Sequence, residues 1–246
     1  MPFTKRCCIF SSSDGGAVRR STPAPISRKE ILLTEHRVTR RRCLGGLLAL
    51  AAAALAAPCA AAAESKADPA TARIRIFYDV LVDTMKHAKA LGIRGRYDKL
   101  APAVRAAYDL PAMTRIAVGP SWPSIPAGQQ AALLDGFADM TIATYANRFD
   151  GYSGERFEVD PVPEPRGADR IVRTKVIKSN GEPVTLNYLM RGSGEDWKIV
   201  DVYLSGTISE LATRRSEFGA ILKSGGPQAL IEALRERSEK LLKYPG

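Results

Sequence analysis

The sequence predicts an α+β domain in which N- and C-terminal helices back a curved antiparallel sheet of about four strands. Three observations predict this fold. Apolar residues recur at helical spacing over residues 68–148, change to a period of two between 151 and 205, and return to helical spacing after 207. Since no repeat or long linker interrupts this order, we expect residues 64–246 to form a single domain.

The first 63 residues have a different character. Arg40–Arg42 precede a run of small apolar residues ending at Ala61-Ala62-Ala63, which is the pattern of a secretory signal peptide over residues 38–63. This run is too short and too rich in alanine to predict a transmembrane helix. Sec export is favoured, although "TRRRCL" resembles a twin-arginine signal. Residues 1–37 have no period, and we expect them to be unstructured or to precede the true start, at Val38.

Most of the net charge of +10 belongs to this N-terminal segment. From residue 64 onward, 26 Lys and Arg oppose 23 Asp and Glu, which leaves +3 without a basic stripe. Nucleic-acid binding is therefore not indicated. All four Cys and one of the two His lie before residue 64, so the remaining chain offers no thiol chemistry and only His87 as a nitrogen ligand. We expect no metal and no cofactor.

The helices follow from caps and apolar spacing. Asp68-Pro69 is predicted to cap and open a first helix that Gly92 and Gly95 end. A short helix is expected over 100–108, and another, capped by Asp109, extends to residue 118. The segment "GPSWPSIP" is predicted to be a loop before a long helix over about 127–148.

Four segments with a period of two are predicted to be strands: "GERFEVDP", "ADRIVRTKVIK", "PVTLNYLMRG" and "DWKIVDVYLS". Asn180-Gly181 between the second and third is typical of a tight hairpin. After Gly206 a capping box is expected, with Thr207 as N-cap and Glu210 at the third helical position. Gly225-Gly226-Pro227 then separates the last two helices.

Asp201 is unusual because it lies within an apolar strand. Simple alternation places it on the face of Trp197 and Ile199, and a buried carboxylate needs a partner. We favour a structural anchor, with Arg173 or Lys175 as partner, over a general base. Other charged candidates are expected to be solvated: Asp79 and Asp83 on the first helix, His87 at its end, and Glu158 on the first strand.

Four blocks in order resemble a known family. "LAPAVRAAYDLPAMTRIAVGPSWPSIPAGQQ", "FADMTIATYANRFDGYSGERFEV", "DWKIVDVYLSGTIS" and "RRSEFGAILKSGGPQALIEAL" are similar to segments of the MlaC-type, or toluene-tolerance, auxiliary components of ABC transport systems. The sequence of these blocks is most similar to the hopanoid-biosynthesis-associated branch of the family, HpnM. One departure is Ser205, where phospholipid carriers of the family have an acidic residue.

The resemblance implies a periplasmic, non-enzymatic carrier that moves hopanoid or phospholipid between the inner and outer membranes. Its partner would be an inner-membrane lipid transporter complex, and it would serve outer-membrane maintenance. Acyl chains would occupy an apolar cavity that the curved sheet and the N- and C-terminal helices enclose. By facing and size, the candidate lipid-binding residues are Phe77, Leu81, Phe137, Met140, Val184, Leu186, Tyr188, Met190, Trp197 and Ile199.

Two other readings remain open on the residues alone. One is an enzyme on a cone-shaped fold like that of nuclear transport factor 2, with Asp201 or Glu158 as general base. The other is an adaptor that holds no lipid and uses its apolar face to bind a transporter subunit.

Overall fold

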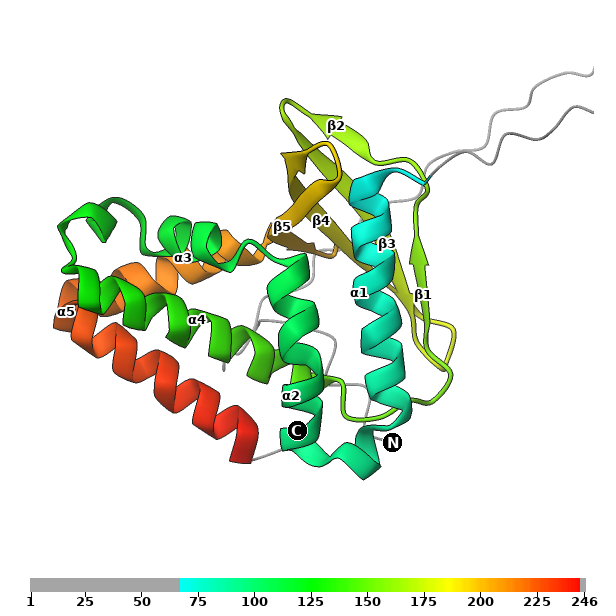
Figure 1. Cartoon of the computed structure of the whole chain (residues 1–246), viewed down its shortest axis with the longest axis horizontal. Helices are drawn as coiled ribbons and strands as arrows, with labels where there is room; N and C mark the ends of the chain where they lie inside the picture. The colour runs from blue at the N-terminus through cyan, green and yellow to red at the C-terminus, as the bar shows by residue number, and fades with distance from the viewer. Residues whose placement is uncertain (1–66, 244–246) are drawn as a thin grey trace, which may run out of the picture. The chain divides into compact units, whose positions relative to one another are not determined.

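The computed structural model describes residues 67–243, so the predictions for residues 1–37 and 38–63 lie outside it. The helices and the strands β1, β3, β4 and β5 share one apolar core, so this segment carries a core of its own. The elements, shown in Figure 1, are α1 (Pro69–Lys86), α2 (Ala88–Ala107), α3 (Leu110–Val118), the 3-10 helix η2 (Gly119–Ser124), α4 (Ala127–Arg148), β1 (Arg156–Val159), β2 (Glu164–Arg166), β3 (Asp169–Ile177), β4 (Pro183–Ser193), β5 (Asp196–Leu204), β6 (Ile208–Ser209) and α5 (Glu210–Lys243).

The fold class is the predicted one, but the sheet has six strands rather than about four. Its order is β1-β3-β4-β5-β6, with β2 also paired to β3, and every pairing is antiparallel. The two unpredicted strands, β2 and β6, have three and two residues, which is too short for a period of two to be visible in the sequence. The four predicted strands correspond to β1, β3, β4 and β5.

The first helix begins as predicted but ends earlier. The Asp68 carboxylate accepts a hydrogen bond from the Ala70 amide at 2.9 Å, and Pro69 occupies the first turn. The helix stops at Lys86, and α2 starts at Ala88 instead of near residue 100. Gly92, with a φ of 59°, lies within α2 and kinks it rather than ending a helix.

The segment "GPSWPSIP" was expected to be a loop, but most of it forms η2. Its prolines fix backbone angles that are compatible with one tight turn of 3-10 helix. Asp109 caps α3 as predicted, accepting a hydrogen bond from the Ala112 amide at 3.0 Å.

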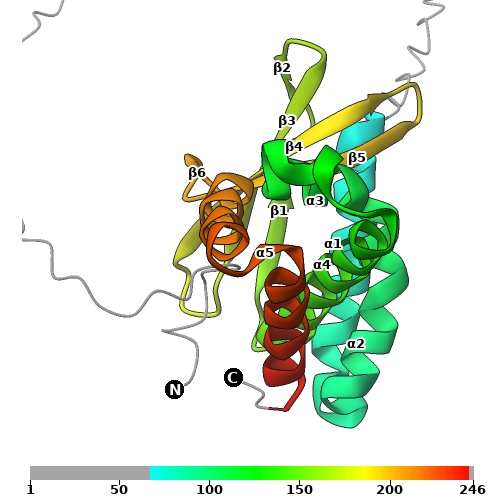
Figure 2. The ribbon, with the colours of Figure 1, turned by 90° about the vertical axis from the view of Figure 1, so that its left-hand side faces the viewer.

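The helices form two groups around the sheet. α1 lies along the sheet, and α2 packs beside it; α4 and α5 pack against each other and join α2 and α3 (Figures 1 and 2). α5 is divided by a kink at Gly226, where φ is 68°, as the sequence predicted. The end of α2 reaches β5, because the Asp109 amide donates to the Ile199 carbonyl at 2.9 Å.

A bulge in β5 changes which side chains face the helices. Asp201 pairs with Leu189 and Ile199 with Met190, so Val200 is the extra residue between them. Simple alternation across this point was therefore wrong: Asp201 lies on the face of Leu189, opposite to that of Ile199. The bulge also turns Val202 to the face of Ile199, which makes the helix-facing side of β5 apolar along its length.

Asp201 is an anchor, but its expected partners were wrong. Its carboxylate accepts hydrogen bonds from the amides of Val202 at 2.8 Å and Leu211 at 3.0 Å, and from the Ser209 hydroxyl at 2.6 Å. Arg173 is instead paired with Glu164 across the exposed face of the sheet. The carboxylate therefore joins β5 to the first turn of α5.

The start of α5 also differs from the predicted capping box. Ser209, not Thr207, caps the helix, and its hydroxyl accepts from the Ala212 amide at 2.9 Å. Glu210 is buried at the first position of α5, where desolvation raises its pKa to about 7 against the opposing effect of Arg214. Ser205 and Gly206, with φ of 50° and 79°, make the tight turn that precedes β6.

We expect Asp201→Ala to lower the free energy of unfolding by about 3 kcal/mol, because two buried amides and a hydroxyl lose their acceptor. Urea unfolding of the 64–246 segment measures this. Asp79→Ala, on the exposed side of α1, is the matched control and should change the value by less than about 0.5 kcal/mol. Equal, small effects of both substitutions would contradict the anchoring role.

Candidate functional site

The ten candidate residues come together in one apolar interior between the sheet and the helices, where they form packed core, and none of them lines the three hollows described below. Nine of them are buried members of a single core cluster, and Val184 is half-buried and packs against it. They come from α1, α4, β4 and β5, as predicted. Register explains the convergence, because Met190 pairs with Ile199 and both side chains face the same way.

The candidates occupy different parts of this interior. Phe77 lies in its centre, with its ring edge-on to those of Tyr108 and Tyr145 at centroid distances of 5.7 and 5.3 Å. Phe137 lies between helices instead, edge-on to Phe218 of α5 at 6.1 Å. A ligand in contact with both Phe77 and Phe137 would therefore have to reach from the sheet to the α4–α5 pair.

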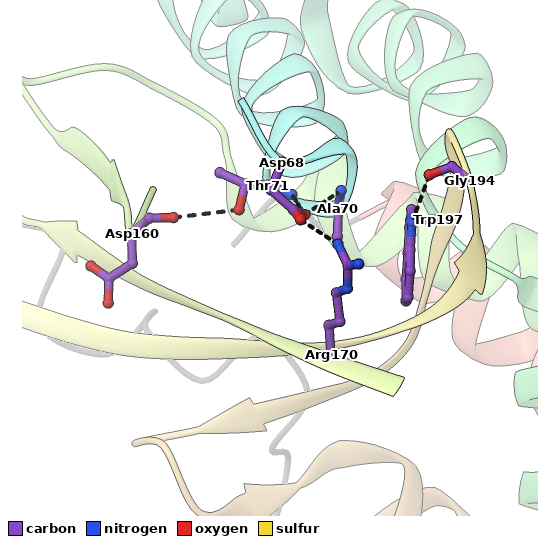
Figure 3. Close-up of polar contacts among 7 residues, drawn as sticks. All are labelled: Asp68, Ala70, Thr71, Asp160, Arg170, Gly194 and Trp197. Carbon is purple, nitrogen blue, oxygen red and sulfur yellow. Dashed lines mark hydrogen bonds and ion pairs between the residues drawn. The ribbon is translucent and has the colours of Figure 1, made fainter. Parts of the chain in front are cut away.

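Trp197 lies at the rim, near the β4–β5 turn (Figure 3). Its indole N–H donates to the Gly194 carbonyl at 3.0 Å, and the Arg170 guanidinium stacks 4.3 Å from its ring centroid. Arg170 also forms an ion pair with Asp68, the cap of α1. This chain of contacts fixes the first turn of α1 to β3 and β5 at one end of the interior.

The sequence analysis missed a chain of buried hydroxyls that crosses the interior. The Tyr78 hydroxyl is hydrogen-bonded to the hydroxyls of Thr174 at 2.8 Å and of Tyr188 at 3.0 Å. On the other side, the hydroxyls of Tyr108 and Tyr145 are hydrogen-bonded to each other. The usable signal was that Tyr188 was expected to face inward, where its hydroxyl needs a partner.

Burial holds these four tyrosines in the neutral form. Desolvation raises the pKa of Tyr78 to about 12, and it raises the pKa of Tyr108, Tyr145 and Tyr188 well above 10. The Thr174 hydroxyl donates to the Leu186 carbonyl at 2.6 Å, which connects the chain to the sheet backbone. The interior is thus apolar at its walls, with a line of satisfied, uncharged polar groups through it.

Two open hollows are each lined by one tyrosine of this chain. One, of about 610 Å³, is lined by Tyr108 together with charged side chains that include Arg105, Asp135 and Lys198. The other, of about 320 Å³, lies between α1 and β1 and is lined by Tyr78 and Phe157. Both hollows are therefore open and carry charged side chains beside one or two aromatic side chains.

The other charged candidates are placed as expected. Asp79 and Glu158 are exposed, and the Asp83 carboxylate faces Lys99 and His87 on the surface of α1 and α2. The Lys99 hydrogen bond lowers the pKa of Asp83. Residues 67–243 contain no group of three or more side chains that could hold a metal ion. None of the helices in this range is both long and apolar enough to cross a membrane.

Comparison with models of known protein families identifies the family of this chain. Residues 77–236 match the model of the MlaC protein family. The chain belongs to the MlaC family. No curated protein sequence is similar to it at a significant level.

A solved structure supports the assignment. This MlaC family member is similar to the phospholipid-binding protein from Ralstonia solanacearum, whose structure was determined in complex with a phospholipid. The two are 27% identical with a TM-score of 0.62, over 70% of this chain and 98% of the other. The α+β fold with an open antiparallel sheet is therefore shared with a protein that binds phospholipid.

The buried hydroxyl chain predicts a fall in stability at high pH. Because folding raises the pKa of Tyr78 from about 10 to about 12, its stabilising contribution is complete below pH 10 and is lost as the pH rises toward 12. We expect the free energy of unfolding to decrease across this window, with the tyrosinate absorbance of the folded protein delayed beyond pH 10. Ionisation of every tyrosine near pH 10 in the folded protein would contradict the buried chain.

Proposed function

We propose that this protein is a periplasmic lipid carrier whose interior holds the acyl chains of a phospholipid or a hopanoid. It would move this cargo between the inner and outer membranes as the soluble part of a transport system with an inner-membrane complex. The observation that carries the proposal is its membership of the MlaC family together with the shared fold of the phospholipid-bound Ralstonia protein.

The chemistry of the interior supports this cargo. Exposing an acyl chain to water costs about 0.8 kcal/mol per CH₂, so a carrier needs a long apolar wall more than it needs strong polar contacts. The candidate residues provide such a wall on both sheet and helices. The tyrosine hydroxyls are hydrogen-bonded within the protein and uncharged, so they would not oppose an acyl chain. The charged rims of the two hollows would suit a head group.

The enzyme alternative is less well supported. Both oxygens of the Asp201 carboxylate are engaged, and the residue is only 7% exposed on the face of the sheet opposite to Ile199. A general base needs a free lone pair within reach of its substrate. Glu158 is exposed on β1, away from the apolar surroundings that would tune a catalytic carboxylate.

Similarity to the hopanoid-associated HpnM branch leads us to place hopanoid beside phospholipid as cargo. Ser205, exposed in the turn before β6, is where the chain departs from phospholipid carriers of the family. We propose that this turn contributes to the choice of membrane partner rather than to cargo binding, since it lies outside the apolar core.

Val184→Asp tests the proposal. Val184 is half-buried at the edge of the interior, so a carboxylate there should be tolerated by the fold while opposing an acyl chain. We expect binding of a fluorescent phospholipid to weaken by at least about tenfold, or about 1.4 kcal/mol.

The matched control is Ile76→Asp, which makes the same kind of change at a residue of α1 that is 60% exposed. It should leave lipid binding unchanged. Thermal unfolding of both variants monitors the fold. Equal lipid binding by both variants, with intact folds, would refute an acyl chain in this interior.

A further inference from the structure

The far end of the helical group combines exposed apolar residues with unopposed positive charge. We call residues 115–128, Arg215 and residues 219–228 the helical tip. They comprise the end of α3, η2, the start of α4 and the kink of α5, and they lie together on the left of Figure 1 and face the viewer in Figure 2. A hollow of about 390 Å³, lined by residues of α3, η2 and α5, joins these segments.

The tip carries three cations and no carboxylate. Arg115, Arg215 and Lys223 are all exposed, and neither segment of the tip contains Asp or Glu. The neighbouring Glu217 of α5 is paired with Arg214 and Arg237. Arg215 and Lys223 line the hollow together with Ser121. This differs from the rest of the described surface, where cations commonly stand beside acids, as in the pairs Arg105–Asp139 and Arg191–Asp169.

The apolar side chains of the tip are held in place. Ile125 is buried and anchors the segment, while Trp122 is half-buried and packs against the core. The Gln130 side-chain amide donates to the carbonyls of Trp122 at 2.9 Å and Ile125 at 3.0 Å. Ile116, on the preceding helix, is 38% exposed. The tip is therefore a preformed surface rather than a loop that must order on binding.

We infer that the helical tip docks on the surface of an anionic phospholipid bilayer. Tryptophan favours the membrane interface, where its apolar body and polar edge are both accommodated. Cations near an anionic surface add to the attraction, and the absence of carboxylates removes the repulsion that such a surface would otherwise exert. The inference goes beyond the proposed function, because docking at the tip requires no cargo in the interior.

Vesicle binding by the 64–246 segment tests the docking surface. Vesicles of equal parts phosphatidylglycerol and phosphatidylcholine should bind the protein, with an affinity that falls as salt is added, and pure phosphatidylcholine vesicles should bind it far less. The triple variant Arg115→Gln, Arg215→Gln, Lys223→Gln should bind about a hundredfold more weakly, at about fivefold per cation.

The control variant removes three exposed cations outside the tip, near the start of α2 and the end of α5: Lys89→Gln, Arg94→Gln and Lys240→Gln. It has the same net charge as the triple variant and should retain nearly all of the binding. An equal loss of vesicle binding in both variants would show that net charge alone causes the effect, and it would overturn the inference.

Trp122 gives a second measurement that does not depend on charge. Brominated phosphatidylglycerol should quench its fluorescence, whereas buried Trp197 should be little affected, so Trp122→Phe should abolish most of the quenching. Absence of vesicle binding by the unchanged protein would overturn membrane docking and leave the tip as a surface for a protein partner. Val184→Asp should dock normally even if it loses lipid, which separates this inference from the proposed function.

Discussion

Two of the hydrogen bonds that Asp201 accepts, from the Ser209 hydroxyl and the Leu211 amide, fix the relation between the sheet and the last helix. They are possible because the bulge at Val200 turns Asp201 to the face opposite Ile199, where the amide of Leu211 can reach it. The same bulge turns Val202 inward beside Ile199. One irregularity in β5 thus supplies both a polar anchor on one face and an uninterrupted apolar wall on the other. The interior owes its apolar lining on this strand to that change of facing.

The buried tyrosines limit which parts of a lipid could lie in the interior. Tyr78 and Tyr188 bring phenol groups from a helix and a strand to one place, and their hydroxyls satisfy one another without any charge. An interior of this kind offers an acyl chain a low-dielectric surface. It offers a polar head group no hydrogen-bonding partner that would replace its hydration. Head-group contacts would then fall to the charged rims of the hollows, which leaves the deep part of the site tolerant of different lipids.

Sequence patterns predicted the elements whose signals are local. The Asp68-Pro69 cap, the period of two in β3 to β5 and the Gly226 kink depend on neighbouring residues, and each lies where it was expected. The predictions that failed concern features that depend on residues distant in the sequence. Whether Gly92 ends or kinks a helix depends on packing, the face of Asp201 depends on an extra residue opposite β4, and strands as short as β6 exist only because β5 is beside them. The resemblance to a lipid-carrying family led to the proposed function, because the residues alone left the enzyme and adaptor alternatives open.

The central claim is that the apolar interior holds lipid in the cell. Native mass spectrometry of the protein recovered from its own host, combined with extraction of any bound lipid, tests it most directly. We expect a mass above that of the polypeptide, and an extract containing phospholipid or hopanoid in proportion to the protein. Recovery of ligand-free protein that also fails to transfer lipid between vesicles would contradict the account.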